Sequence, residues 1–87
     1  MSFDEMLEKI NELGVKIPME AFIKLNTCYM ELLTTNLKVN MAEKYLDNHD
    51  DDAPDYLKVY DRWVKLVDLH AKQYCNIMEM FETLGAK

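Results

Sequence analysis

The chain has 87 residues, of which 49% are hydrophobic and 30% are charged, and it contains only two glycines and two prolines. This composition excludes a disordered chain and argues against a β fold built from many turns. The net charge is −6 and Arg62 is the only arginine, so we expect no direct binding to the phosphate backbone of nucleic acid.

The sequence also predicts where the protein acts. No apolar run reaches the roughly 20 residues of a membrane span, and residues 1–13 are acidic where a signal peptide would be basic and then apolar. We therefore expect a cytoplasmic protein without a membrane partner. Cys28 and Cys75 have no CxxC spacing and are predicted to be reduced thiols. A single domain, 1–87, has a small core at this length, which favours association with further subunits.

The first helix is predicted over residues 2–13. The segment Ser2-Phe3-Asp4-Glu5 is a capping box, in which the Ser2 hydroxyl accepts from the Glu5 amide and the Glu5 carboxylate reaches back to the Ser2 amide. Gly14 is typical of the residue that follows a helix end. Pro18 requires an extended residue before it and favours a new helix start.

The second helix is predicted over residues 18–46. A row that steps by four and three predicts its contact with another helix, and it consists of Ala21, Leu25, Cys28, Leu32, Thr35, Val39, Ala42 and Leu46. Beside it lies a second apolar row, which comprises Phe22, Tyr29, Leu33, Leu37 and Met41. The apolar face is therefore wider than one helix contact requires.

The third helix is predicted over residues 53–84. Its main row is Tyr56, Tyr60, Trp63, Val67, His70, Tyr74, Ile77, Phe81 and Leu84, and a weaker row contains Val59, Leu66, Leu69 and Met80. On the solvated side, Asp61–Lys65 and Asp68–Lys72 are spaced for i,i+4 ion pairs.

The two long helices should fold back on each other, because only a short acidic turn, 47–52, joins them. The predicted fold class is all-α: a short N-terminal helix followed by a long antiparallel helical hairpin, assembling into a helical-bundle oligomer. The surplus apolar residues are assigned to the oligomer interface, and these are Phe22, Leu33, Leu37, Met41, Leu66 and Leu69.

The acidic turn has two interpretations, which the sequence leaves open. Residues 47–61 contain six acidic residues and one lysine, a charge of 1 − 6 = −5. As a capped loop, Asp52 caps a helix that has Pro54 in its first turn. As a site, the turn offers carboxylates to a basic protein partner, and these are Asp47, Asp50, Asp51 and Asp55. A calcium loop is not expected, because no register supplies Gly at the sixth position and Glu at the twelfth.

No constellation of residues specifies a catalytic chemistry. His70 and Cys75 are five apart, which does not suit two zinc ligands on one helix, and Cys28 with His70 is the only nucleophile and base that can be proposed. We therefore expect no metal, no cofactor and no enzymatic activity. The leading interpretation is a small interaction or inhibitor protein, of a phage-type accessory kind, that self-associates and docks its acidic turn on a basic protein.

Two alternative functions remain. The layout of a short helix, "GVKIP", a long helix, "NHDDDAP" and another long helix resembles the small phage proteins that sequester cyclic-nucleotide immune signals as helical oligomers. This resemblance implies a nucleotide-like ligand between protomers, with candidate residues Lys24, Asn26, Tyr29, Tyr60 and Arg62. The other alternative is an architectural or packaging subunit.

Overall fold

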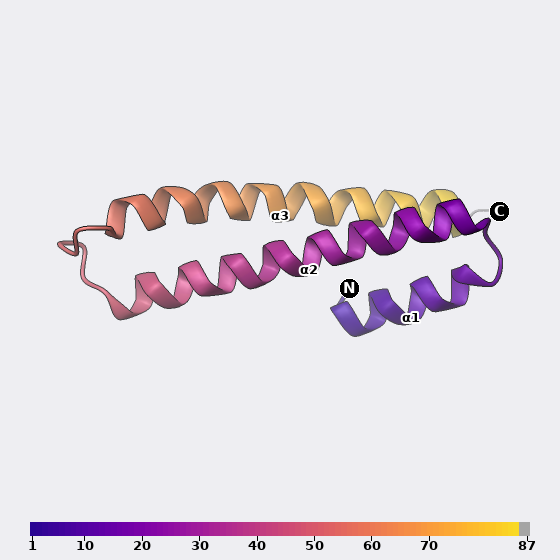
Figure 1. The fold of residues 1–87 in the computed structure, drawn as a ribbon, viewed down its shortest axis with the longest axis horizontal. Helices are drawn as coiled ribbons and strands as arrows, with labels where there is room; N and C mark the ends of the chain where they lie inside the picture. Colours follow the sequence, from indigo (N-terminus) through magenta and orange to yellow (C-terminus); the bar gives the residue numbers. More distant parts are fainter. Residues whose placement is uncertain (86–87) are drawn as a thin grey trace.

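Three helices make up the protein. The computed structural model describes residues 1–85, in which α1 spans Phe3–Gly14, α2 spans Met19–Asn48 and α3 spans Tyr56–Gly85. Figure 1 shows α2 and α3 antiparallel along their whole length, with α1 running back along the half of α2 farthest from the α2–α3 turn. The molecule is a rod of 53 × 18 × 18 Å.

The predicted all-α hairpin with a short N-terminal helix is confirmed. Within residues 1–85, no helix has the long apolar stretch that crossing a membrane requires.

The start of α1 follows the predicted capping box, with one difference. The Ser2 hydroxyl accepts from the Glu5 amide at 3.2 Å, as expected. The Glu5 carboxylate, however, accepts from the same hydroxyl at 3.2 Å, whereas we predicted a bond to the Ser2 amide. The Ser2 carbonyl then accepts from the Met6 amide at 3.0 Å, which begins the helical ladder.

The third helix begins three residues later than predicted. Two successive turns precede it, because the Ala53 amide donates to the Asp50 carbonyl at 2.9 Å and the Tyr56 amide donates to the Ala53 carbonyl at 3.1 Å. Helical bonding starts with the Val59 amide on the Asp55 carbonyl, at 3.0 Å. Ala53 precedes Pro54, and a residue before proline is disfavoured in the helical region, which opposes a helix start at residue 53. The predictions that Asp52 caps the third helix and that Pro54 lies in its first turn are therefore wrong.

Gly14 is used for close packing and not for a left-handed turn. It is the last residue of α1, and neither described glycine has a positive φ. A Cβ added to Gly14 would lie 2.7 Å from a ring carbon of Phe22, at the start of α2. The missing side chain thus lets the end of α1 approach α2 closely.

The core is concentrated in one half of the rod. We call residues 1–33 and 72–85 the base half and residues 34–71 the tip half. The largest fully buried side chains all lie in the base half, and they are Met6, Ile10, Leu25, Leu32 and Ile77. In the tip half, the buried residues are Thr35, Val39 and Ala42, all of them on α2. The difference arises because α1 reaches along the base half only (Figure 1).

The predicted main row of α3 separates into two rows in the structure. One faces the hairpin partner α2 and contains Tyr56, Trp63, His70, Ile77 and Leu84, each half-buried or buried. The other faces the side on which α1 packs and contains Tyr60, Val67, Tyr74 and Phe81. Phe81 is buried, but Tyr60 is 48% exposed and Val67 38% exposed. The prediction that Tyr60 and Val67 share one main row with Trp63 was therefore wrong. The N-terminal end of α1, where the Met1 amino group donates to the Tyr74 hydroxyl at 2.8 Å, does not extend as far as these two residues.

Candidate interaction surfaces

The outward side of α2 carries an apolar surface that no described residue covers. Five large side chains on it are more than half exposed, and we call them the outer face of α2: Met19, Ile23, Met30, Leu37 and Met41. Their spacing of four, seven, seven and four residues keeps them on one side of the helix, away from the buried Leu25, Leu32 and Val39. The second predicted row contained only Leu37 and Met41 of this set. The seven-residue repeat of Ile23, Met30 and Leu37 is the sequence pattern that indicates the remaining part of this face.

The polar residues beside the outer face already have hydrogen-bond partners. The Thr27 hydroxyl donates to the Ile23 carbonyl at 2.9 Å, and the Thr34 hydroxyl donates to the Met30 carbonyl at 2.9 Å. The Asn26 side-chain amide donates to the Phe22 carbonyl at 3.1 Å. Covering these residues with a partner would therefore leave few donors without an acceptor, which lowers the cost of removing water from this surface.

Charged residues lie only along one flank of this surface. Between residues 19 and 41 the charged side chains are Glu20, Lys24, Glu31 and Lys38, and none falls among the five apolar side chains. An open hollow of ≈ 630 Å³ follows α2 from Phe22 to Lys38 and is bordered by Leu69 and Gln73 of α3. The outer face is thus an uncharged strip with a charged margin.

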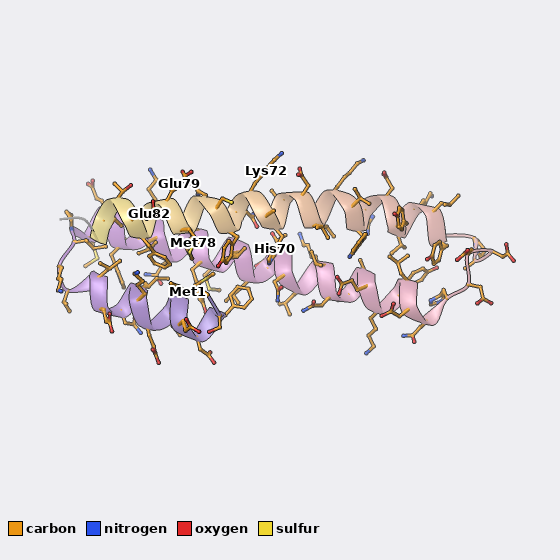
Figure 2. All side chains as sticks on the ribbon, turned by 180° about the vertical axis from the view of Figure 1, so that it is seen from behind. Met1, His70, Lys72, Met78, Glu79 and Glu82 are labelled. Carbon is orange, nitrogen blue, oxygen red and sulfur yellow. The ribbon has the colours of Figure 1, made fainter. Side chains whose placement is uncertain are left out.

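Two polar groups at the α2–α3 contact have no hydrogen-bond partner among the described residues. They are the His70 Nε2 and the Gln73 Oε1, one turn apart on α3. A buried polar atom without a partner costs stability, typically about 1–3 kcal/mol. Figure 2 shows His70 and Met78 on the inner side of α3, whereas Lys72 and Glu79 point outward to solvent.

The acidic turn is exposed throughout. Its five aspartates, Asp47, Asp50, Asp51, Asp52 and Asp55, are all solvent-exposed. The two ion pairs formed within residues 1–85 lie elsewhere: Asp61–Lys65 at 3.1 Å and Asp68–Lys72 at 3.0 Å, both as predicted. His49 is held against the end of α2, since its ring stacks on Tyr45 at 3.8 Å and its Nδ1 lies 2.8 Å from the Tyr45 carbonyl. The carboxylates are therefore free to meet another molecule.

The residues assigned to the oligomer interface occupy different environments. Leu37 and Met41 are 63% and 72% exposed on α2, and Leu69 is 44% exposed on α3. Phe22 and Leu33 are half-buried and pack against the core cluster, and Leu66 is half-buried in the hairpin. Three of the six thus remain available at the surface.

The residues assigned to a ligand site are dispersed within one chain. Tyr29 is buried in the base half, where its hydroxyl donates to the Phe3 carbonyl at 3.3 Å and its ring meets the Phe3 ring edge-on. Lys24 borders a hollow near Cys28 and Asn76, while Tyr60 and Arg62 border two separate hollows in the tip half. The fold of a single chain does not bring this set together.

Neither cysteine has the surroundings of a reactive nucleophile. Burial raises the pKa of the Cys28 thiol, with a further contribution from the Glu31 carboxylate, so the thiol stays protonated at neutral pH. Its hydrogen-bond partner is the side-chain amide of Asn76, at 3.7 Å. Cys75 is exposed, and both thiols are free. Among residues 1–85, no three His, Cys, Asp or Glu side chains are grouped so that they could hold a metal ion.

Comparison of the chain with protein families, with curated protein sequences and with solved structures found no match in any of the three.

Proposed function

We propose that the protein is a non-enzymatic interaction protein that binds another protein through the outer face of α2 and so occupies that partner's surface. The observation that carries this proposal is an exposed helix face that is apolar, free of charge and flanked by polar groups bonded to their own backbone. Exposed apolar side chains aligned on one helix face are typical of protein interaction sites.

The shape of the face favours a protein partner over a small molecule. From Met19 to Met41 it is about 33 Å long at 1.5 Å per residue, and it is the convex side of a helix. Such a face suits an extended apolar groove on another protein. The hollow beside it is open to solvent, whereas small ligands bind in enclosed concave sites.

The acidic turn supplies the second part of the proposal. It lies at one end of the rod, and its carboxylates have no ion-pair partner within residues 1–85. Asp47, Asp50, Asp51 and Asp55 would then meet basic groups beside the partner's apolar groove. Exposed charges act mainly by speeding association, so their contribution should weaken as salt is added.

The cysteine and histidine side chains give little support to catalysis. Cys28 is paired with Asn76 and keeps its proton at neutral pH, whereas a thiol nucleophile needs a base beside it. His70 presents a buried Nε2 to the hairpin contact, and no described residue bonds to it. A binding role explains the exposed apolar face without requiring any reactive group.

The test is capture of partner proteins from a lysate by the immobilised chain, at low and at high salt, followed by mass spectrometry. Met30→Lys places a charge in the centre of the outer face and should reduce recovery of the captured protein at least about tenfold. Leu7→Lys is the control, because Leu7 is an exposed apolar residue (42%) on α1. Equal recovery by the wild type and Met30→Lys would contradict the proposal. Strong thermal stabilisation of the chain by a cyclic nucleotide would favour the ligand-sequestering alternative instead.

A further inference from the structure

The side of α3 that contacts α1 carries a longer apolar row than α1 covers. Eight residues recur along it with steps of three and four: Leu57, Tyr60, Val64, Val67, Ala71, Tyr74, Met78 and Phe81. A seven-residue repeat of this kind marks a surface built to receive another helix. In the base half, Tyr74 and Met78 pack against the core cluster, which includes Phe81 and to which α1 contributes Met6 and Ile10.

In the tip half the same row has no cover. Leu57 is 77% exposed, Tyr60 48%, Val64 45% and Val67 38%. We call these four residues the open row. The base half shows what a matching occupant is, namely a helix whose own apolar residues pack along the row.

We infer that the open row of α3 binds the open row of a second copy of this chain, with the two α3 helices antiparallel. In a two-fold symmetric contact the same surface must complement itself. An antiparallel pairing centred at the level of Arg62 meets this condition. It places Leu57 opposite the partner's Val67 and Tyr60 opposite the partner's Val64, so every residue of the open row meets an apolar residue.

Neighbouring registers are less favourable. A shift by one heptad in one direction places Leu57 against the partner's Tyr74, a residue that packs in the cluster formed with α1. A shift in the other direction places Val67 beyond the start of the partner's α3 at Tyr56, so that no residue of that helix lies opposite it. Only the register centred at Arg62 uses the whole open row and leaves both copies of α1 in place.

The distribution of charge selects the antiparallel direction. A parallel pairing would set the two acidic turns side by side, each within a segment of charge −5. The antiparallel pairing places them at opposite ends of the stretch over which the two α3 helices overlap, residues 56–68, which is about 18 Å long and thus beyond the screening length of about 8 Å at physiological salt.

The first test is the oligomeric state of the full chain by light scattering and sedimentation at micromolar concentration. We expect twice the mass of one chain. Val64→Lys should raise the dissociation constant at least about tenfold, because it buries a lysine at the centre of the contact. Leu69→Lys is the matched control on the same helix, since Leu69 is exposed to nearly the same degree (44%) but lies outside the open row. Three results would overturn the inference. The wild type could be a monomer, Val64→Lys could leave the dimer unchanged, or the dimer could be lost only in Leu69→Lys.

The second test fixes the direction by cysteine cross-linking in a Cys28→Ala, Cys75→Ser background. Leu57→Cys mixed with Val67→Cys should form a disulfide-linked dimer, whereas each variant alone should form several-fold less. Efficient self-linking of each variant alone would indicate a parallel pairing and overturn the proposal.

Both tests are independent of the partner proposed for α2. A monomeric Val64→Lys chain that still captures that partner separates the two surfaces, and loss of capture without loss of the dimer would contradict only the proposed function.

Discussion

The base half and the tip half of the rod are made from the same two helices, yet they differ in how well those helices are buried. In the base half α1 adds a third helix, and α3 contributes the buried residues Ile77 and Phe81. In the tip half α3 contributes no buried residue, and five of its large apolar side chains are more than a third exposed. A two-helix contact buries one stripe of each helix, whereas a third helix also covers the groove beside it. The tip half is thus the part that has most to gain from a partner.

The largest expected effect compares an aromatic residue from each half. Phe81 is 3% exposed in the base half, and truncation to alanine should cost roughly 3–5 kcal/mol of unfolding free energy. Trp63 is only half-buried in the tip half, and its Nε1 donates to the exposed Glu43 carboxylate at 3.2 Å. From the sequence alone, truncation of Trp63 to alanine would be expected to cost as much unfolding free energy as truncation of a buried aromatic residue. From the structure we expect Trp63→Ala to cost less than about 3 kcal/mol.

Urea denaturation followed by circular dichroism measures both losses. A Trp63→Ala variant as unstable as Phe81→Ala would show that the tip half is packed as tightly as the base half, and the comparison of the two halves would fail.

Gly14→Ala tests the packing between α1 and α2. Alanine is the better helix former by about 1 kcal/mol, so propensity alone predicts a gain in stability. The added Cβ, however, would lie 2.7 Å from the Phe22 ring, and overpacking of this kind costs roughly 1–3 kcal/mol. We expect a net loss of about 1 kcal/mol. Gly85→Ala is the control, because a Cβ there has no atom within 4 Å. A more stable Gly14→Ala protein would mean that α1 does not approach α2 so closely.

Gln73→Leu tests a buried polar group near the boundary between the halves. The Gln73 Oε1 has no partner among residues 1–85, so replacing the amide with an apolar side chain should remove a desolvation cost. We expect a gain of about 1 kcal/mol, which corresponds to a rise in melting temperature of about 4–8 °C for a chain of this size. A fall in melting temperature would show that Gln73 is satisfied by water or by a ligand.

Much of the fold follows from local pattern. The three helices, their antiparallel hairpin and the two i,i+4 ion pairs were predictable, because capping, proline placement and helical spacing act between residues close in sequence. The burial of the rows on α3 was not predictable in the same way. The row through Trp63 is apolar except for His70, the row through Val67 is apolar throughout, and both repeat every seven residues. Which of them is covered depends on how far α1 reaches.

That reach is set by length. Helix α1 has 12 residues and so extends about 18 Å, whereas the 30 residues of α3 extend about 45 Å. The outer face of α2 was only partly predictable for a related reason. The seven-residue repeat of Ile23, Met30 and Leu37 runs parallel to the core row, and the sequence does not show which of the two rows is covered.

The smallest expected effect concerns the acidic turn at the end of the tip half. Asp47, Asp50 and Asp51 form no ion pair within the described chain, so changing all three to asparagine should leave the fold intact. Their removal reduces repulsion among like charges, and Asp47 lies near the negative C-terminal end of α2, so a gain of a few tenths of a kcal/mol is expected. Melting curves at low and high salt check this, because added salt should stabilise the wild type more than the variant.

Asp61→Asn is the control, and its expected effect has the opposite sign. It breaks the Asp61–Lys65 pair and should lower the free energy of unfolding by a few tenths of a kcal/mol. A loss above about 1 kcal/mol in the triple variant would show that these aspartates hold the turn together, as a helix cap does. Unchanged stability with slower, less salt-sensitive partner capture would instead support their role as a binding surface.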